Sequence, residues 1–291
     1  MPAGRGSMRE GERGGNFMSR VGIASWTCEE DGTVDALRRI ARHGFQDVEV
    51  WCNYAHLDPR LGEDVTRVQE ILTRERLRAV SLHAPYEFRG EMLSSKTAWA
   101  AWEELMAQVL ETARLLQVSF MVVHPVLLWF PSDSAEGEPE VSGCQEESLK
   151  KVARAAGRKG IRIALENLCR TTAPGFADLR ELAKLTHRLD EDNVGICFDT
   201  GHCLASGLDP LREIDYCATM LCSFHLHEND GVEDLHWVPG KGRIDWPRFF
   251  DKLRALDYSD AFILEIWGGT NAEAVMNEAK GFLERHHLMD R

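Results

Sequence analysis

The chain alternates short runs of apolar and β-branched residues with longer segments of helical spacing, from Val21 to Arg285. The runs that predict strands cover residues 21–24, 47–51, 78–83, 118–124, 161–166, 194–199, 220–227 and 261–265. The segments that predict helices cover residues 33–43, 64–76, 94–116, 145–159, 176–189, 210–219, 246–256 and 272–285. Strands that are apolar throughout are typical of parallel sheets buried on both faces. Eight such strand–helix pairs predict an α/β chain folded as a (β/α)8 TIM barrel.

An open, doubly wound sheet is the alternative architecture for this alternation. It is disfavoured because no glycine-rich phosphate loop follows the first predicted strand. No linker interrupts the pattern, so one domain is expected over residues 19–291. Residues 1–18 contain little to bury and are expected to form a disordered leader, with Met18 as a second candidate start.

Composition limits the classes of partner. The chain has 47 acidic and 34 basic residues and a formal net charge of −13, which argues against broad electrostatic binding to nucleic acid or an anionic membrane. No apolar run is long enough to span a bilayer. The eight Cys residues form no CxxC motif, which indicates reduced thiols and a cytoplasmic location.

Polar residues stand where the predicted strands end. In a (β/α)8 barrel these ends meet at one mouth, where active sites lie, so side chains that are distant in sequence should converge. Two neighbouring loops add three more residues. The candidate site residues are His83, His124, Glu166, Asp199, His202, His227, Asp234, His236 and Glu265.

Each of these residues also has a structural interpretation. A lone His can be hydrogen-bonded in the core, Asp199 can cap a helix, and Glu166 and Glu265 can pair with Arg or Lys. Taken together, three carboxylates at buried strand ends would repel one another without cations between them. Nitrogen and oxygen ligands without Cys suit zinc, manganese or iron. His225 also faces inward but lies deeper, so it is expected to support the ligands rather than bind metal.

The motifs resemble those of the xylose-isomerase-like TIM barrels, and among them the endonuclease IV (apurinic endonuclease) branch. Any one of them is weak, whereas all of them in this order are specific for the superfamily. They are Leu82-His83-Ala84-Pro85-Tyr86, Val123-His124-Pro125, Leu165-Glu166-Asn167, Phe198-Asp199-Thr200-Gly201-His202, His227-Glu228-Asn229-Asp230, Asp234-Leu235-His236, Pro239-Gly240-Lys241-Gly242 and Leu264-Glu265.

In the endonuclease branch these positions hold three zinc ions. The resemblance implies one ion on His83, His124 and Glu166. It implies a second on Glu166, Asp199, His227 and Glu265, with Glu166 bridging, and a third on His202, Asp234 and His236. Sugar isomerases and epimerases of the superfamily keep only the second set and use two glutamates, here Glu166 and Glu265, as the acid/base pair.

Because all nine positions are present, the resemblance favours a metal-dependent phosphodiester hydrolase that acts on a small phosphodiester or on abasic DNA. The alternative is a divalent-metal-dependent sugar or sugar-phosphate isomerase or epimerase, and a non-catalytic barrel is the third possibility. DNA is disfavoured because Glu87 replaces the apolar partner of Tyr86 in the wedge that enters DNA in the endonuclease branch. The loops over 52–62 and 125–143 are expected to shape substrate specificity.

Overall fold

The computed structural model describes residues 20–53, 56–62, 64–89, 95–130, 138–140 and 144–288. The leader expected over residues 1–18 lies outside these residues. Among the described residues, no helix combines the length and the apolarity that crossing a membrane requires.

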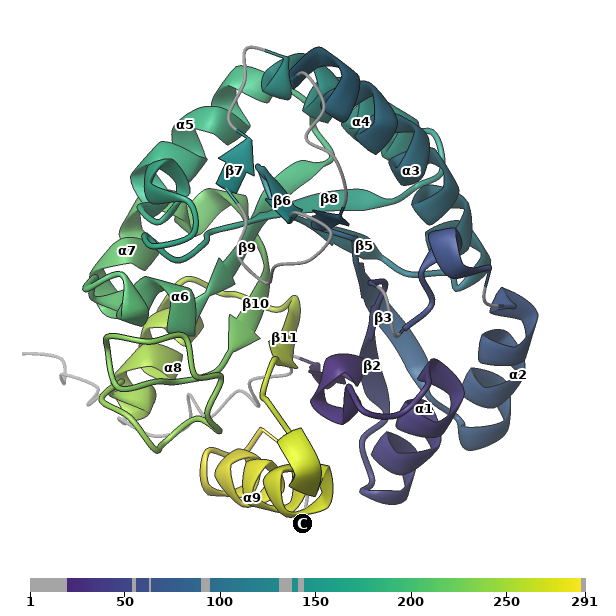
Figure 1. The fold of residues 1–291 in the computed structure, drawn as a ribbon. Coiled ribbons are helices and arrows are strands. Elements are labelled where there is room, and N and C mark those ends of the chain that lie inside the picture. Colours follow the sequence, from purple (N-terminus) through teal and green to yellow (C-terminus); the bar gives the residue numbers. More distant parts are fainter. Residues whose placement is uncertain are drawn as a thin grey trace, which may run out of the picture.

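Eight parallel strands close into a barrel, which confirms the predicted fold (Figure 1). Around the barrel their order is β1, β11, β10, β9, β8, β5, β3 and β2, so the last strand pairs with the first. The strands are β1 (Val21–Ala24), β2 (Asp47–Trp51), β3 (Arg78–His83), β5 (Phe120–Val123), β8 (Arg162–Glu166), β9 (Val194–Asp199), β10 (Leu221–Leu226) and β11 (Ala261–Leu264).

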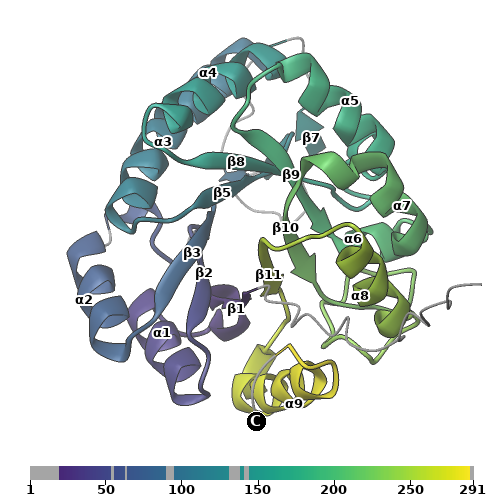
Figure 2. The same cartoon turned by 180° about the vertical axis from the view of Figure 1, so that it is seen from behind.

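Helices cover the outside of the barrel, and α9 completes the ring next to α1 (Figures 1 and 2). The helices are α1 (Thr33–Arg42), α2 (Val65–Glu75), α3 (Ser95–Leu115), α4 (Gln145–Gly157), α5 (Leu179–Leu189), α6 (Thr200–Ala205), α7 (Pro210–Cys217), α8 (Trp246–Ala255) and α9 (Ala272–Arg285). Helix α5 begins three residues later than expected because Asp178 caps it by accepting a hydrogen bond from the amide of Arg180.

A small apolar layer fills the barrel below its mouth. It includes Ala164 and Ile263, which are fully buried. Residues two apart in a strand face the same way. Glu166 lies two residues beyond Ala164, and Glu265 lies two residues beyond Ile263. The apolar floor therefore directs both carboxylates into the cavity above it, and it keeps water away from their inner side.

The segments after β3 and β5 contain regular structure that the sequence analysis did not predict. Strands β4 (Glu87–Arg89), β6 (Leu127–Phe130) and β7 (Glu138–Glu140) form a second, three-stranded sheet. The interpretation of residues 125–143 as a loop was therefore wrong for β6 and β7. Each run is only three or four residues long, too short for periodicity to separate a strand from a loop.

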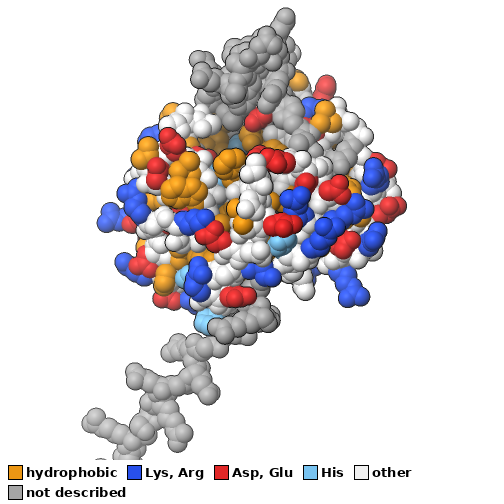
Figure 3. Space-filling model, turned by 60° about the horizontal axis from the view of Figure 1, so that its bottom comes forward, with side chains coloured by type: hydrophobic (Ala, Val, Ile, Leu, Met, Phe, Trp, Pro, Cys, Tyr) orange, Lys and Arg blue, Asp and Glu red, His pale blue; other side chains and the backbone are white. Residues whose placement is uncertain are grey.

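Charged side chains of both signs are interspersed over the face shown in Figure 3. This distribution fits a solvated surface.

Candidate metal centre

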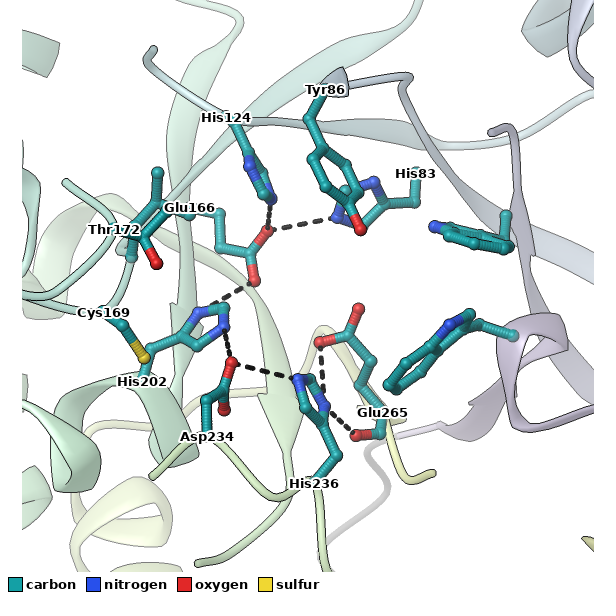
Figure 4. Close-up of a pocket in the computed structure, with 13 residues that line it drawn as sticks. His83, Tyr86, His124, Glu166, Cys169, Thr172, His202, Asp234, His236 and Glu265 are labelled. Carbon is teal, nitrogen blue, oxygen red and sulfur yellow. Dashed lines mark hydrogen bonds and ion pairs between the residues drawn. The ribbon is translucent and has the colours of Figure 1, made fainter. Parts of the chain in front are cut away.

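Histidine and carboxylate side chains from the ends of β3, β5, β8 and β11, from α6 and from the loop after β10 converge on a single cavity at the C-terminal mouth of the barrel (Figure 4). The cavity has a volume of about 140 Å³. It is lined by Trp26, Trp51, His83, Tyr86, His124, Glu166, Leu168, Cys169, Thr172, His202, Asp234, His236 and Glu265. The ionisable atoms form four groups, each with its atoms within 4.8 Å of one another. One of them, His83, His225 and Glu265, joins residues of two of the others, and those other three are called sets A, B and C below.

Set A consists of His83, His124 and Glu166. One carboxylate oxygen of Glu166, Oε2, lies 3.2 Å from Nε2 of His83 and 3.0 Å from Nε2 of His124. The other ring nitrogen of His83, Nδ1, lies 3.0 Å from the carbonyl oxygen of Ala84, which fixes the ring orientation. The three atoms that would bind an ion therefore face one another, as the sequence analysis expected.

Set B consists of Glu166, Asp199, His225 and Glu265. Nδ1 of His225 lies 2.9 Å from Oε1 of Glu166 and 3.2 Å from Oε2 of Glu265. Glu166 thus turns one oxygen to set A and the other to set B. His225 stands among these carboxylates, whereas His227, the histidine expected here, lies 2.9 Å from Asp199 and outside this group, so which of the two would bind an ion stays a prediction.

The two histidines have different surroundings because β10 ends between them, at Leu226. His225 is within the strand and points into the barrel among the carboxylates, whereas His227 follows the last strand residue, Leu226. Glu49 on β2, which the sequence analysis missed, lies beside His225. Its Oε1 is 3.1 Å from Nε2 of His225, and its Oε2 accepts a hydrogen bond of 2.7 Å from Ser81.

Set C consists of His202, His227, Asp234 and His236. Oδ2 of Asp234 lies 3.1 Å from Nε2 of His202 and 3.3 Å from Nε2 of His236. The rings of His227 and His236 stack with their centroids 3.8 Å apart. The three residues expected together are therefore together, and His227 joins them.

Asp199 connects set B with set C. It caps α6 by accepting a hydrogen bond of 2.6 Å from the amide of His202, and it lies 2.9 Å from Nε2 of His227. Asp199 thus caps a helix, as its structural interpretation predicted, and also contacts a histidine of the candidate site. Helix α6 follows β9 without a loop, and this places His202 at the cavity three residues after the strand end.

The carboxylates are neutralised by imidazoles rather than by Arg or Lys. Burial by itself would raise the pKa of Glu166, but the neighbouring His225 and His124 hold it well below its ordinary value. Burial opposes protonation of His236, yet the Asp234 carboxylate raises the pKa of His236 to about 9. The groups therefore need positive charge between them, which either protons or metal ions can supply.

Two properties of these residues suit divalent metal ions: the type of donor atom, and the presence of buried donor atoms without a hydrogen bond. Among the residues that the structure describes, Nδ1 of His124 and Nδ1 of His227 are buried without a hydrogen bond. Unpaired buried polar atoms are costly and call for a partner. Imidazole and carboxylate donors without a thiolate in any set suit zinc, manganese or iron.

Aromatic rings form part of the cavity wall. Tyr86 packs flat on His124, with ring centroids 4.4 Å apart, and does not stand out as a wedge. Trp26 contacts His236 edge to face at 4.7 Å, and Trp51 lies 6.2 Å from Trp26. The sequence analysis missed both tryptophans, although Trp51 ends a predicted strand and Trp26 lies two residues beyond another.

These features define a parallel barrel with a mouth of histidines and carboxylates. The chain belongs to the xylose isomerase-like TIM barrel family, whose description matches residues 37–286. It is 24% identical over 254 residues to the uncharacterized protein MJ1311 of Methanocaldococcus jannaschii, covering 84% of this chain and 83% of the relative. A shorter match, 26% identical over 136 residues, is an inosose dehydratase of Geobacillus thermodenitrificans, covering 41% of this chain and 45% of the relative.

Solved structures with the same fold include proteins of different named activities. A D-tagatose 3-epimerase-like protein superposes with a TM-score of 0.75 and 21% identity, covering 92% of this chain and 97% of the other. An AP endonuclease, family 2, from Brucella melitensis superposes with a TM-score of 0.70 and 17% identity, covering 91% of this chain and 99% of the other. The IOLI protein, solved with a bound zinc atom, superposes with a TM-score of 0.68 and 17% identity, covering 91% of this chain and 97% of the other.

Proposed function

We propose that this protein is a metal-dependent phosphodiester hydrolase that acts on a small phosphodiester. The observation that carries the proposal is set C, because it adds a further group of ligands beside the two sets that share Glu166. A single-ion isomerase needs only set B. Set C adds four ionisable groups at the same mouth, and two of them, His202 and His227, are buried histidines whose desolvation is costly unless they bind something.

Divalent ions held by the three sets would lower the pKa of a bound water, neutralise the phosphate and stabilise the leaving oxygen. In the reaction, the water oxygen forms a bond to phosphorus, and the bond from phosphorus to the leaving oxygen breaks. The products are a phosphomonoester and an alcohol. Glu265, whose carboxylate lines the cavity, would take the proton that the water loses, and the leaving oxygen would take up a proton in turn to give the alcohol.

The residues that line the cavity indicate which class of phosphodiester it would bind. Among the described residues that line it, none is Lys or Arg. The phosphate would therefore depend on the metal sets for its counter-charge, and the rest of the substrate would meet the rings of Trp26, Trp51 and Tyr86. A compact phosphodiester with an uncharged cyclic group fits this wall better than duplex DNA, because Tyr86 lies inside the cavity.

A sugar isomerase or epimerase is the second candidate. The observation in its favour is that carboxylate oxygens of Glu166 and Glu265 lie within 4.8 Å of each other in set B. Such a pair can move a proton between carbons next to a carbonyl group. The epimerase-like and dehydratase relatives support this alternative, and set C would then have no catalytic role.

The two candidates differ in their dependence on set C. We would assay hydrolysis of bis(4-nitrophenyl) phosphate and conversion of a panel of free ketoses, using zinc- or manganese-loaded protein. For the hydrolase, His236→Ala should reduce phosphodiester turnover by about 10²-fold or more, the scale of losing one electrostatic contribution to a transition state. Ketose conversion that is insensitive to His236→Ala, without phosphodiester turnover in the parent protein, would establish the isomerase instead.

A further inference from the structure

We infer that Glu228 is a positioning residue that holds the loop carrying Asp234 and His236 in the shape that set C requires. The position of the loop does not depend on the proposed function. Only the importance of set C for turnover rests on that function. Glu228 is fully buried two residues after the end of β10 and belongs to none of the three sets.

The carboxylate of Glu228 gathers three N–H donors from the far side of the loop. Oε2 accepts a hydrogen bond of 2.5 Å from the amide of Gly240 and one of 3.1 Å from the indole of Trp246. Oε1 accepts a hydrogen bond of 2.6 Å from the amide of Ile244. One side chain thus connects the start of the loop to the start of α8.

The backbone of Glu228 closes the same loop. Its amide donates to the carbonyl oxygen of Trp237 at 2.9 Å, and its carbonyl oxygen accepts from the amide of Trp237 at 2.7 Å. Asp234 and His236 lie within the segment that this pair of hydrogen bonds closes. Their distances to His202 therefore depend on the pairing of Glu228 with Trp237.

The Pro239-Gly240-Lys241-Gly242 motif is explained by this arrangement. Gly240 has a φ of +95°, a conformation that favours glycine and that turns its amide toward Glu228. A Cβ atom at Gly242 would lie 2.6 Å from the carbonyl oxygen of Asn229 and 2.9 Å from the carboxyl carbon of Glu228. Glycine at position 242 therefore permits the backbone to pass beside the carboxylate.

His236 shows why such a constraint matters. Its φ is +45°, which is uncommon for a residue other than glycine and must be stabilised by its surroundings. Nδ1 of His236 lies 2.8 Å from the carbonyl oxygen of Glu265, and the amide of Trp267 donates to the carbonyl oxygen of His236 at 2.9 Å. A loop released from Glu228 would relax this conformation and draw Nε2 of His236 away from Asp234.

The test is Glu228→Gln, with Glu233→Gln as the matched control, because Glu233 lies on the same loop but is exposed. Gln retains the size of the side chain and offers one acceptor oxygen in place of two. Hydrogen–deuterium exchange of the metal-free protein would report on residues 229–246, and zinc titration with elemental analysis would count the bound ions. Gly242→Ala tests the same contact independently if Glu228→Gln fails to fold.

In Glu228→Gln we expect faster exchange confined to residues 229–246. We also expect zinc affinity to fall by about 10–100-fold at set C alone, the scale seen when a group that orients a metal ligand is removed. Unchanged exchange in this segment, or an equal loss of zinc from all three sets, would overturn the inference. The exchange measurement needs no metal. A parent protein that binds no ion at set C would refute the proposed function and leave the role of Glu228 to be decided by exchange.

Discussion

Glu166→Gln should remove two metal ions with one substitution. Oε2 of Glu166 faces the two histidines of set A, and Oε1 faces His225 of set B. A neutral amide offers one oxygen and one N–H₂ group, so it cannot serve both sets. An ion present at 100 times its dissociation constant stabilises the folded state by about 2.7 kcal/mol, so losing two removes about 5.4 kcal/mol. At 2–4 °C per kcal/mol, the zinc-induced rise in melting temperature should shrink by about 10–20 °C.

The assay is differential scanning calorimetry of each protein with and without zinc, together with elemental analysis of bound metal. Comparing each variant with its own metal-free form removes any effect of the substitution on the metal-free protein. Glu70→Gln, an exposed change on α2, is the control and should retain the full zinc-induced rise. Loss of a single ion in Glu166→Gln, with the remaining stabilisation intact, would refute the sharing of Glu166 between sets A and B.

Three further results are expected. Since the pKa of His236 is raised to about 9, its contribution to folding is complete below its ordinary pKa of about 6.5 and is lost as pH rises through 9. The melting temperature of the metal-free protein should therefore fall from pH 6.5 to 9.5, while the zinc-induced rise should grow, and a flat profile would contradict this assignment. Gly201→Ala places a Cβ atom 2.0 Å from Cε1 of His227, and it should cost about 1–3 kcal/mol in urea unfolding and lose the set C ion. Glu49→Gln should weaken zinc binding at set B by about 10-fold or more by releasing His225, and titration with elemental analysis would show this.

The sequence predicted the barrel because its evidence is local and repeated. Each strand run is apolar enough to be buried on both faces, and each helix segment has an apolar stripe, so eight repeats support one another. The convergence of Glu166, Asp199 and Glu265 then follows from the topology of the barrel alone. Set A could be predicted for the same reason, because His83 ends β3 and His124 directly follows β5.

The different surroundings of His225 and His227 could not be predicted from the sequence. Both residues face the same way by alternation, and their distances to Glu166 and Asp199 depend on where β10 ends relative to the neighbouring strands. The role of Glu49 could not be predicted for a related reason. A carboxylate within a strand does not indicate a site until its partner across the barrel, here His225, is known. The role of Glu228 depends on a turn over residues 239–244 whose contacts are tertiary.

The most direct test of a three-set metal centre is a crystal structure of the zinc-loaded protein, with anomalous diffraction measured on both sides of the zinc absorption edge. The account predicts three anomalous peaks: one between His83 and His124, one among Asp199, His225 and Glu265, and one between His202 and His236. A single peak at set B, with sets A and C free of metal at saturating zinc, would contradict it.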